Sequence, residues 1–403
     1  MKVLFITDNF PPEVNAPAAR TYDHCKRWVE SGADVTIITC VPNFPQGKVY
    51  DGFKNKLYQK EYIDGIKVIR VWSYITANEG FLKRIIDYTS FAFMAFWVGL
   101  FQSCDVIIAT SPQFFTTFTG WSLSKLKMRP WVFELRDLWP ESIVSVGAMK
   151  KGIAIEIFEK IEQFMYRSAD MIIPVSDAFK KHLIGRGIPA EKIHVVTNGV
   201  DPQKFPVKEK NEKLLKKLNL ENKFIIGYIG THGMAHGLDF IIRTLKKIND
   251  SSIHFLFVGD GAAKLSTEQL AGELELNNVT FLPPVSKDEV SEYVGLSDAV
   301  LVPLKKSDTF KAVIPSKIFE SAAMSKPILL GVDGQAREIV EQYNAGLYFE
   351  PENEEEFIKS VTEIKNNRIL YANIQCGEKK LADAYDRNRL ADKMLSYIST
   401  LKI

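Results

Sequence analysis

Short apolar runs alternate with helical patterns along this chain, and the alternation begins a second time near residue 224. In the first half the apolar runs lie at residues 3–7, 35–39, 68–72, 106–110, 131–134, 171–175 and 193–197. In the second half they lie at residues 224–229, 254–258, 279–281, 299–302 and 327–330. Continuous apolar strands separated by helices are typical of parallel sheets that are covered on both faces. The pattern therefore predicts an α/β fold with two doubly wound domains.

The division between the two halves is expected in a polar segment, residues 202–222. This segment contains Pro202, Pro206 and six lysines, interleaved with acidic residues. It predicts a solvated linker with a short charged helix, and a polyanion site is the alternative. We expect a first domain at residues 1–201 and a second at residues 202–386, which suits a length of 403 residues.

Composition and charge exclude several classes of protein. With 51 basic and 49 acidic residues, the formal charge is +2, so nothing global favours nucleic acid as a partner. The four cysteines are scattered without a C-x-x-C pair, which indicates a reduced, cytoplasmic protein. The first apolar run is short and ends before Asp8, so it predicts a buried strand rather than a signal peptide.

Seventeen residues without a charge, Tyr88–Cys104, are rich in aromatic side chains and follow Lys83 and Arg84. A spanning helix needs about 20 apolar residues, so this segment is short for that role. Two interpretations stay open besides spanning. One is a buried core helix. The other is a helix in a membrane interface, with its aromatic face in the lipid and its basic residues at the headgroups.

Two glycine turns follow strands of the second half. In the first, Gly230–Gly237, backbone N–H groups can meet a diphosphate at the start of a helix. His232 and His236 are four residues apart, but no acid follows His232 as in a zinc-binding H-E-x-x-H. We interpret His232 as facing phosphate, because the surrounding glycines leave it little apolar cover. The second turn, Gly259–Gly261, fits the lining of a base or ribose site.

A third element of the second half is the segment Lys311–Ala322. Pro315 and Ser316 predict a helix start, where the positive end of the dipole and Lys317 attract phosphate. Glu320 lies one turn further and can accept hydrogen bonds from two ribose hydroxyls. The alternative is a capped helix with a surface Lys–Glu pair, which contributes only about 0.2–0.5 kcal/mol.

The loops of the first half carry a different set of residues. The loop after the first strand contains two prolines and no glycine, so it is not a dinucleotide-binding turn. It is either a rigid connection or a substrate-facing loop. The segment Phe133–Ser142 gathers three acids, an arginine and a tryptophan at the carboxyl edge of the predicted sheet, where charges are either paired or used. The chain has no Asp-x-Asp pair, so we expect no metal ion and no cofactor.

Together, these elements resemble retaining glycosyltransferase family four, whose fold is GT-B: two Rossmann-like domains that face each other across a cleft. The resemblance covers nearly the whole chain and rests on the ordered segments Asn9–Glu13, Val175–Ser176, Ile193–Asp201, Gly230–Gly237, Gly259–Gly261, Asp298–Pro303 and Pro315–Glu320. Asp137–Ser142 and Pro315–Glu320 are also similar to bacterial O-antigen and capsule enzymes. Several of these are proposed to transfer N-acetyl-L-fucosamine from a UDP donor.

The resemblance implies a role for each part. The first domain would bind an undecaprenyl-diphosphate-linked glycan acceptor at the inner membrane surface, the second would bind a UDP-sugar, and residues 387–403 would form a helix that returns to the first domain. The donor residues would be Gly230, Thr231, His232, Gly233, Gly259, Pro284, Val285, Ser316, Lys317 and Glu320. Glu13, Asn15, Arg136 and Trp139 would face the sugar and acceptor, and the catalytic residues would be Asp137, Lys317 and Glu141.

The sequence departs from the wider family in three places. Ala312 stands where the family often has a glutamate, and His232 and His236 stand where it often has an arginine and a lysine. Arg136 and Asp137 follow the strand after which the family often has a histidine. Two other functions therefore stay open, a sugar-nucleotide epimerase of the same fold and a non-catalytic partner that binds a sugar nucleotide.

Overall fold

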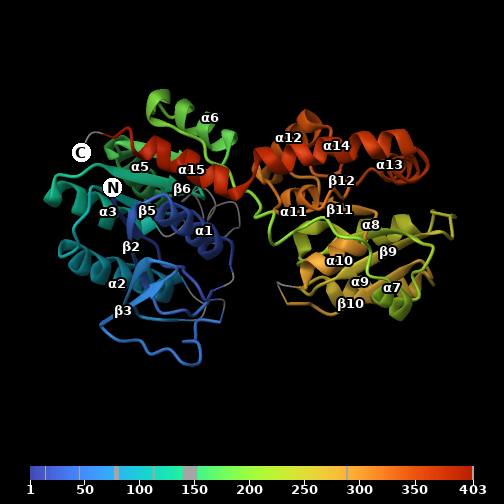
Figure 1. The fold of residues 1–403 in the computed structure, drawn as a ribbon, viewed down its shortest axis with the longest axis horizontal. Coiled ribbons are helices and arrows are strands. Elements are labelled where there is room, and N and C mark those ends of the chain that lie inside the picture. Colours follow the sequence, from blue (N-terminus) through green and yellow to red (C-terminus); the bar gives the residue numbers. More distant parts are fainter. Residues whose placement is uncertain are drawn as a thin grey trace. The chain divides into compact units, whose positions relative to one another are not determined.

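The computed structural model describes residues 1–13, 15–44, 46–76, 81–111, 114–138, 152–286 and 289–401. The chain divides into two compact units, Met1–Asn198 with Arg387–Ile403, and Gly199–Asp386. Each unit is a Rossmann-like α/β domain with helices on both faces of its sheet, as Figure 1 shows. The predicted fold class is confirmed.

The sheet of the first unit has seven strands in the order β3-β4-β2-β1-β5-β6-β7. Their bounds are β1 (Lys2–Ile6), β2 (Asp34–Cys40), β3 (Tyr58–Ile63), β4 (Ile66–Val71), β5 (Val106–Thr110), β6 (Trp131–Leu135) and β7 (Met171–Pro174). The central strand β1 pairs with β2 and β5 in parallel, so that Val3 lies beside Val35 and Val106. The edge strand β3 runs antiparallel to β4.

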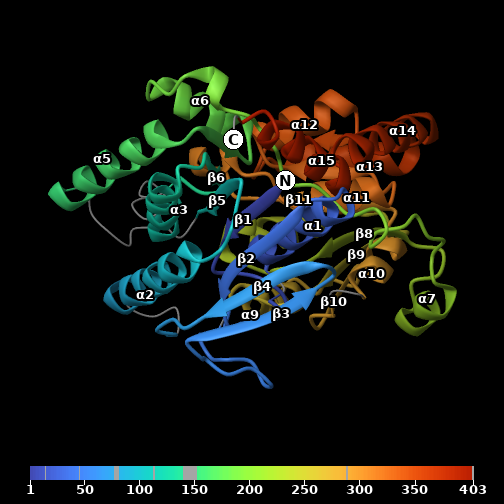
Figure 2. The same cartoon turned by 60° about the vertical axis from the view of Figure 1, so that its left-hand side comes forward.

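Helices cover both faces of this sheet because its strands are apolar on both sides. Leu4 and Ile6 pack into one core with α2 (Phe81–Leu100), α3 (Phe114–Lys127) and α5 (Ile153–Ser168). Val3 and Phe5 pack into the other core with α1 (Ala16–Glu30) and α15 (Arg387–Ile398). Figure 2 shows α2, α3 and α5 together on one side of the sheet. The helix α6 (Asp177–Gly185) and the 3-10 turn η1 (Ala190–Lys192) follow β7.

The last helix, α15, packs on α1 although more than 350 residues of sequence separate them. The indole Nε1 of Trp28 donates to the carbonyl of Ala391 at 2.8 Å, and Arg27 pairs with Asp392 at 2.9 Å. Met394 is fully buried in the core below. Residues 387–398 are therefore part of the first unit's core.

The prediction of a strand at residues 193–197 is wrong. This segment makes one isolated bridge, between Ile172 and Ile193. Its Val196 and Thr197 carbonyls accept hydrogen bonds from the guanidinium of Arg20 instead, at 2.8 and 2.6 Å. The side chain of Arg20 thus occupies two backbone carbonyls that would otherwise be available to pair with a strand.

The sheet of the second unit has six parallel strands in the order β10-β9-β8-β11-β12-β13. Their bounds are β8 (Phe224–Ile229), β9 (Ile253–Val258), β10 (Val279–Leu282), β11 (Ala299–Pro303), β12 (Ile328–Gly331) and β13 (Gly346–Tyr348). The helices are α7 (Glu212–Leu218), α8 (Leu238–Leu245), α9 (Lys264–Glu273), α10 (Val290–Leu296), α11 (Lys317–Ala323), α12 (Gln335–Tyr343), α13 (Glu354–Asn366) and α14 (Arg368–Ala384), with 3-10 turns η2 (Met234–His236) and η3 (Asp308–Ala312).

The polar segment expected as a linker is attached to the second unit. Lys208 pairs with Glu292 at 2.5 Å, and Lys210 pairs with Asp298 at 2.6 Å. Within the segment, α7 forms the short charged helix that was predicted, and its leucines pack against the core of this unit.

The aromatic segment forms α2, which has two different apolar faces. Phe91 and Ala95 are buried against the sheet. Phe93, Trp97 and Phe101 are 62%, 49% and 83% exposed, so the core-helix interpretation explains only one face. Of the helices in the described part of the chain, none, α2 included, combines the length and the apolar character that crossing a membrane requires.

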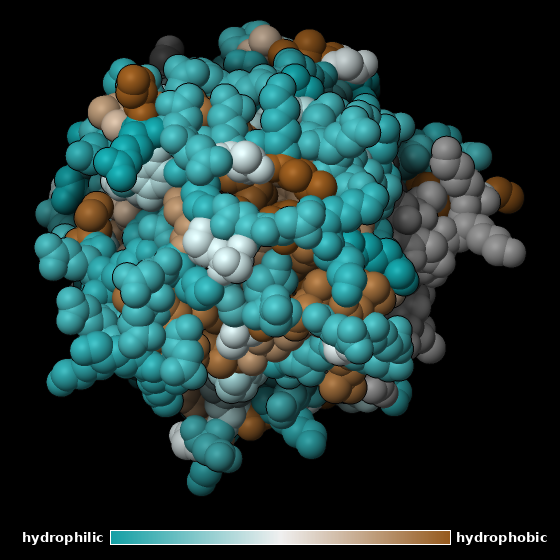
Figure 3. Space-filling view, turned by 90° about the vertical axis from the view of Figure 1, so that its right-hand side faces the viewer, coloured by the Kyte–Doolittle hydropathy of each residue, from teal (hydrophilic) through white to brown (hydrophobic). Residues whose placement is uncertain are grey.

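The polarity of the molecular surface can be followed on one face in a space-filling view. On the face in Figure 3, hydrophilic residues predominate and hydrophobic residues appear in separate groups among them. Such a mixture is ordinary for a surface in contact with water.

Candidate active site

In the second unit, the two glycine turns touch each other through their backbones. Gly230 and Gly259 have φ values of 136° and 145°, which residues with a side chain rarely adopt. A Cβ on Gly259 would lie 1.9 Å from the carbonyl oxygen of Gly230, so only glycine fits there. Lys264 ties these turns to the end of β10, because its Nζ donates to the carbonyls of Gly259 and Leu282 at 2.8 and 3.0 Å.

Lys317 begins α11 and reaches the first of these turns. Its Nζ lies 4.6 Å from the centre of the Tyr228 ring. A Cβ on Gly230 would lie 2.9 Å from its Cε, so the side chain passes against bare backbone. Burial lowers the pKa of Lys317, and the charge of Glu320 opposes that effect. A half-buried ammonium held on an aromatic face beside an uncovered glycine backbone is suited to an anion.

The interpretation that His232 lacks apolar cover is wrong. Its side chain is 0% exposed, and its ring centre lies 5.4 Å from that of Tyr228 and 6.2 Å from that of Phe257. Burial, followed by the charges of Lys264 and Lys317, lowers its pKa to about 4, so the ring is neutral at pH 7. Neither ring nitrogen has a hydrogen-bond partner among the described residues.

The remaining donor residues lie around this centre. Ser316 precedes α11 but makes no side-chain cap, and a helix of seven residues has a weak dipole, so Lys317 is the main positive group there. Glu320 is half-buried one turn further along α11. Pro284 and Val285 follow β10, and Val285 packs partly against the core. The predicted donor residues thus group at the carboxyl ends of β8, β9 and β10 and at the start of α11.

In the first unit, Arg136 and Asp137 follow β6. Their backbone N–H groups donate to the Oγ of Ser111 at 2.8 and 3.3 Å. The guanidinium of Arg136 donates to the carbonyl of Pro17 at 3.2 Å. Burial lowers its pKa to about 10, against the charge of Glu134. Trp139 and Glu141, the other residues predicted here, lie outside the described residues.

The buried ion pair behind this segment involves a residue that the sequence analysis missed. Arg20 on α1 pairs with Glu134 on β6 at 2.9 Å, and both side chains are buried. Burial alone would raise the pKa of Glu134, but the charges of Arg20 and then Arg136 outweigh it and hold the pKa below its ordinary value. The charges at the end of β6 are therefore partly structural.

Glu13 and Asn15 are brought to one cavity of the first unit, with a volume of about 440 Å³. Glu13 is 4% exposed, and its Oε1 accepts hydrogen bonds from the backbone of Asn43 and Phe44 at 2.8 and 2.9 Å. Asn15 caps α1 through Ala18 N at 2.8 Å, and its Nδ2 donates to another lining residue, Asn9, at 2.6 Å. The same cavity is lined by side chains from α2 that the sequence analysis did not assign.

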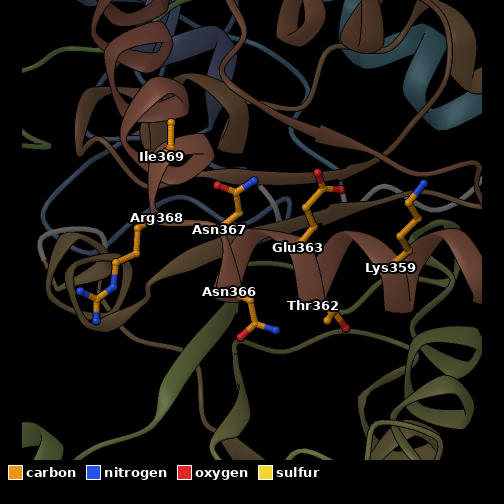
Figure 4. Close-up of a pocket in the computed structure, with 7 residues that line it drawn as sticks. All are labelled: Lys359, Thr362, Glu363, Asn366, Asn367, Arg368 and Ile369. Atoms are coloured by element: carbon orange, nitrogen blue, oxygen red, sulfur yellow. The ribbon is translucent and has the colours of Figure 1, made fainter.

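A hollow of about 840 Å³ lies where α13 meets α14, and Figure 4 shows its seven lining residues. None of them is a predicted site residue, and one of them, Asn367, caps α14 through Leu370 N at 3.0 Å. In the described ranges, His, Cys, Asp and Glu side chains form no group of three or more that could hold a metal ion.

Each of the two units of the chain matches a known protein family. The family "Glycosyl transferase 4-like domain" matches residues 15–199, and the family "Glycosyl transferases group 1" matches residues 210–380. The chain belongs to the group 1 glycosyltransferases. The loops after β8 and β9 and the helix α11 of this glycosyltransferase all lie within the second matched region.

Relatives of this glycosyltransferase are found by sequence and by structure. The "Putative colanic acid biosynthesis glycosyl transferase WcaI" of Escherichia coli (strain K12) is 26% identical over 328 residues, which are 79% of this chain and 80% of that protein. The structure of Anabaena Alr3699/HepE in complex with UDP aligns over 100% of both chains with a TM-score of 0.70 and 17% identity. Sucrose-phosphate synthase from Thermosynechococcus elongatus aligns over 99% of this chain and 98% of its own with a TM-score of 0.75 and 14% identity.

Proposed function

We propose that this glycosyltransferase moves a sugar from a UDP donor to a lipid-linked glycan in the synthesis of a bacterial surface polysaccharide, as in O-antigen or capsule. We assign N-acetyl-L-fucosamine or a related amino sugar as the donor sugar. The observation that carries the proposal is the position of Lys317, held on Tyr228 against the bare backbone of Gly230. The UDP bound to the similarly folded HepE and the name of the colanic acid relative support it.

In this proposal the second unit binds the donor. Lys317 and the backbone N–H group of Thr231 hold the diphosphate, and their fixed charges stabilise the UDP that leaves. The N–H groups of Gly230, His232 and Gly233 already donate to Val258 O, Asp260 O and His236 Nδ1, so they do not take part. Glu320 accepts hydrogen bonds from the ribose, and Gly259 lies beside the nucleoside. Pro284 and Val285 line the base. Thr231 and Ser316 complete the wall of the site, and the buried ring of His232 packs behind it on Tyr228.

The reaction proposed is retaining and needs no metal ion. The acceptor hydroxyl attacks the sugar carbon on the same face that UDP leaves, and the leaving phosphate accepts the hydroxyl proton. Asp137, or else Glu141, stabilises the positive charge that develops at the sugar carbon. Arg136 and Trp139 face the sugar and the acceptor in this scheme, with Arg136 fixed by the carbonyl of Pro17.

Thermal unfolding with a panel of UDP-sugars tests the donor assignment. We expect one UDP-amino sugar to stabilise the protein selectively, by about 2.7 kcal/mol at 100 times its Kd, because a ligand that binds only the folded state shifts the equilibrium. A panel without any stabilising UDP-sugar contradicts the proposal. So does conversion of the donor in the absence of an acceptor, which identifies an epimerase.

We also propose that α2 rests on the cytoplasmic face of an anionic membrane, where a lipid-linked acceptor would be found. Phe93 and Trp97 on α2, with Phe101 directly after it, form an exposed aromatic face. Lys83, which is exposed, lies in the first turn of α2 at one end of this face. At the other end, α3 finishes with Lys125 and Lys127, and the Nζ of Lys127 donates to the carbonyl of Leu100 at 2.7 Å. Basic residues at both ends of an apolar face match anionic headgroups.

Binding to liposomes tests this surface. Replacing Phe93, Trp97 and Phe101 together by serine is expected to abolish co-sedimentation with anionic liposomes, because the aromatic contact area is lost. Phe96 is left in place because it packs partly against the core. The control replaces Leu265 and Ile369, which are 80% and 77% exposed in the second unit, by serine. Equal binding of both variants would contradict the proposal.

A further inference from the structure

The cavity beside Glu13 has a second wall that comes from α2. One wall is the loop after β1, with Asp8 and Glu13, and the other is the first half of α2, with Arg84, Asp87 and Tyr88. All of these residues belong to the first unit. The cavity therefore opens at the carboxyl end of the central strands, which is where ligands bind in open α/β sheets.

The loop wall of the cavity is fixed before any ligand arrives. Arg70, which is buried, donates to the carbonyl of Pro11 at 2.5 Å and to that of Cys40 at 3.1 Å. The carbonyl of Asp8 accepts from Thr39 Oγ1 at 2.9 Å. Bonds of this kind across neighbouring strands make a preorganised site.

Three carboxylates meet in this cavity. The Oε2 of Glu13 is buried and has no hydrogen-bond partner in the described part of the chain. Burial, and then the charge of Asp8, raises the pKa of Asp87 to about 7. Crowding acids away from water costs stability, and such clusters occur where the acids contact a ligand. Carboxylates accept hydrogen bonds, so the ligand here carries hydrogen-bond donors.

The α2 wall adds an aromatic surface and a positive charge. Arg84 is exposed, and its Nη2 donates to the hydroxyl of Tyr88 at 2.8 Å. The guanidinium carbon lies 5.6 Å from the centre of the same ring. Tyr88 and Phe91 thus supply apolar area inside the cavity, and Arg84 supplies a cation beside it that is suited to a phosphate.

We propose that this cavity binds the acceptor sugar, through hydroxyl or amino groups that donate to Asp8, Glu13 and Asp87, with the phosphate that joins the sugar to its lipid on Arg84. The acceptor sugar is therefore a neutral or amino sugar, since Arg84 is taken by the phosphate and the carboxyl groups of Asp8, Glu13 and Asp87 offer no positive partner to a uronic acid. The inference rests on the proposed function. It adds Asp8, Arg84, Asp87 and Tyr88 to the residues that recognise the acceptor.

Steady-state kinetics with undecaprenyl-diphosphate-linked glycans tests this assignment. The panel ends in a neutral sugar, an amino sugar or a uronic acid, and each is assayed at saturating UDP-sugar. We expect the wild type to use a neutral or amino member. Asp87→Ala and Arg84→Ala should each raise the KM for that acceptor about ten-fold or more, which is typical of a lost hydrogen bond to a charged group. The KM for the UDP-sugar should not change.

Three comparisons distinguish a failure of this inference from a failure of the proposed function. Asp51→Ala, an exposed acid of the same unit, is the matched control and should leave both KM values unchanged. For Arg84→Ala, the loss should disappear with an acceptor that lacks the phosphate. Use of only the uronic acid, use of no member, or unchanged acceptor KM in both variants overturns the inference if UDP-sugar still stabilises the protein. Failure of every UDP-sugar to stabilise the wild type overturns the proposed function instead.

Discussion

Replacing Lys317 by alanine is expected to slow sugar transfer by about 10²–10³-fold, the loss typical when one fixed donor to a developing anion is removed. The ammonium is the positive group that the structure places beside the turn at Gly230. The fold should survive, because burial lowers the pKa of Lys317 and its charge therefore does not stabilise the folded state. The measurements are kcat at saturating acceptor and thermal stabilisation by UDP, both of which should fall.

Two further variants make this test specific. Lys359→Ala removes an exposed lysine of the same unit and should behave as the wild type. Gly230→Ala keeps Lys317 but places a methyl group 2.9 Å from its Cε, so transfer should fall through displacement of the side chain. Turnover of Lys317→Ala at the wild-type rate would remove this residue from the mechanism.

Replacing Glu134 by alanine is expected to lower the free energy of unfolding of the first unit by about 3–5 kcal/mol, because it leaves a buried charge without its partner. Arg20 is nearly as buried as Glu134 and lies 2.9 Å from it. Arg136 would also lose the charge that opposes its desolvation. Urea unfolding of the full chain is the measurement, analysed with a separate transition for each unit.

The control for this variant is an exposed ion pair in the same unit. Glu30 lies 3.6 Å from Arg27 with about half of its side chain exposed, so Glu30→Ala should change the free energy of unfolding by less than about 1 kcal/mol. Replacing Arg20 and Glu134 together by methionine and leucine should recover part of the loss. Equal effects of Glu134→Ala and Glu30→Ala would show that the buried pair is not what holds β6 to α1.

Most of the parallel strands could be predicted from the sequence because they are continuous apolar runs that are buried on both faces. Two strands could not. Tyr58–Ile63 alternates exposed and half-buried residues, includes Lys60 and Glu61, and pairs only at the sheet edge as an antiparallel strand. Gly346–Tyr348 is three residues long and has no pattern of its own. Edge strands are specified by their neighbours more than by their own composition.

The residues of the candidate site also fall into two groups, those that the local sequence marks and those that it does not. The glycine turns and Lys317 are visible in the sequence because each is a local motif with a recognisable neighbour. The pair of Arg20 with Glu134 joins residues 114 positions apart. Glu134 belongs to the charged segment that the sequence marks, but nothing local marks Arg20 as its partner. Asp87 directly precedes the aromatic run, and its own local sequence carries no motif that marks it as a site residue. Its environment depends on Asp8, which reaches it only through the fold.

The packing of α15 on α1 has a consequence for how the protein is made. The ribosome synthesises Leu390, Met394 and Ile398 after the whole second unit, yet these side chains fill the core beside β1. During synthesis the second unit has all of its strands first, while this face of the first unit's sheet is covered by α1 without α15. Nascent chains with exposed apolar surface aggregate readily. The interval before the last helix is made is therefore when the apolar face of the first unit is most open to aggregation.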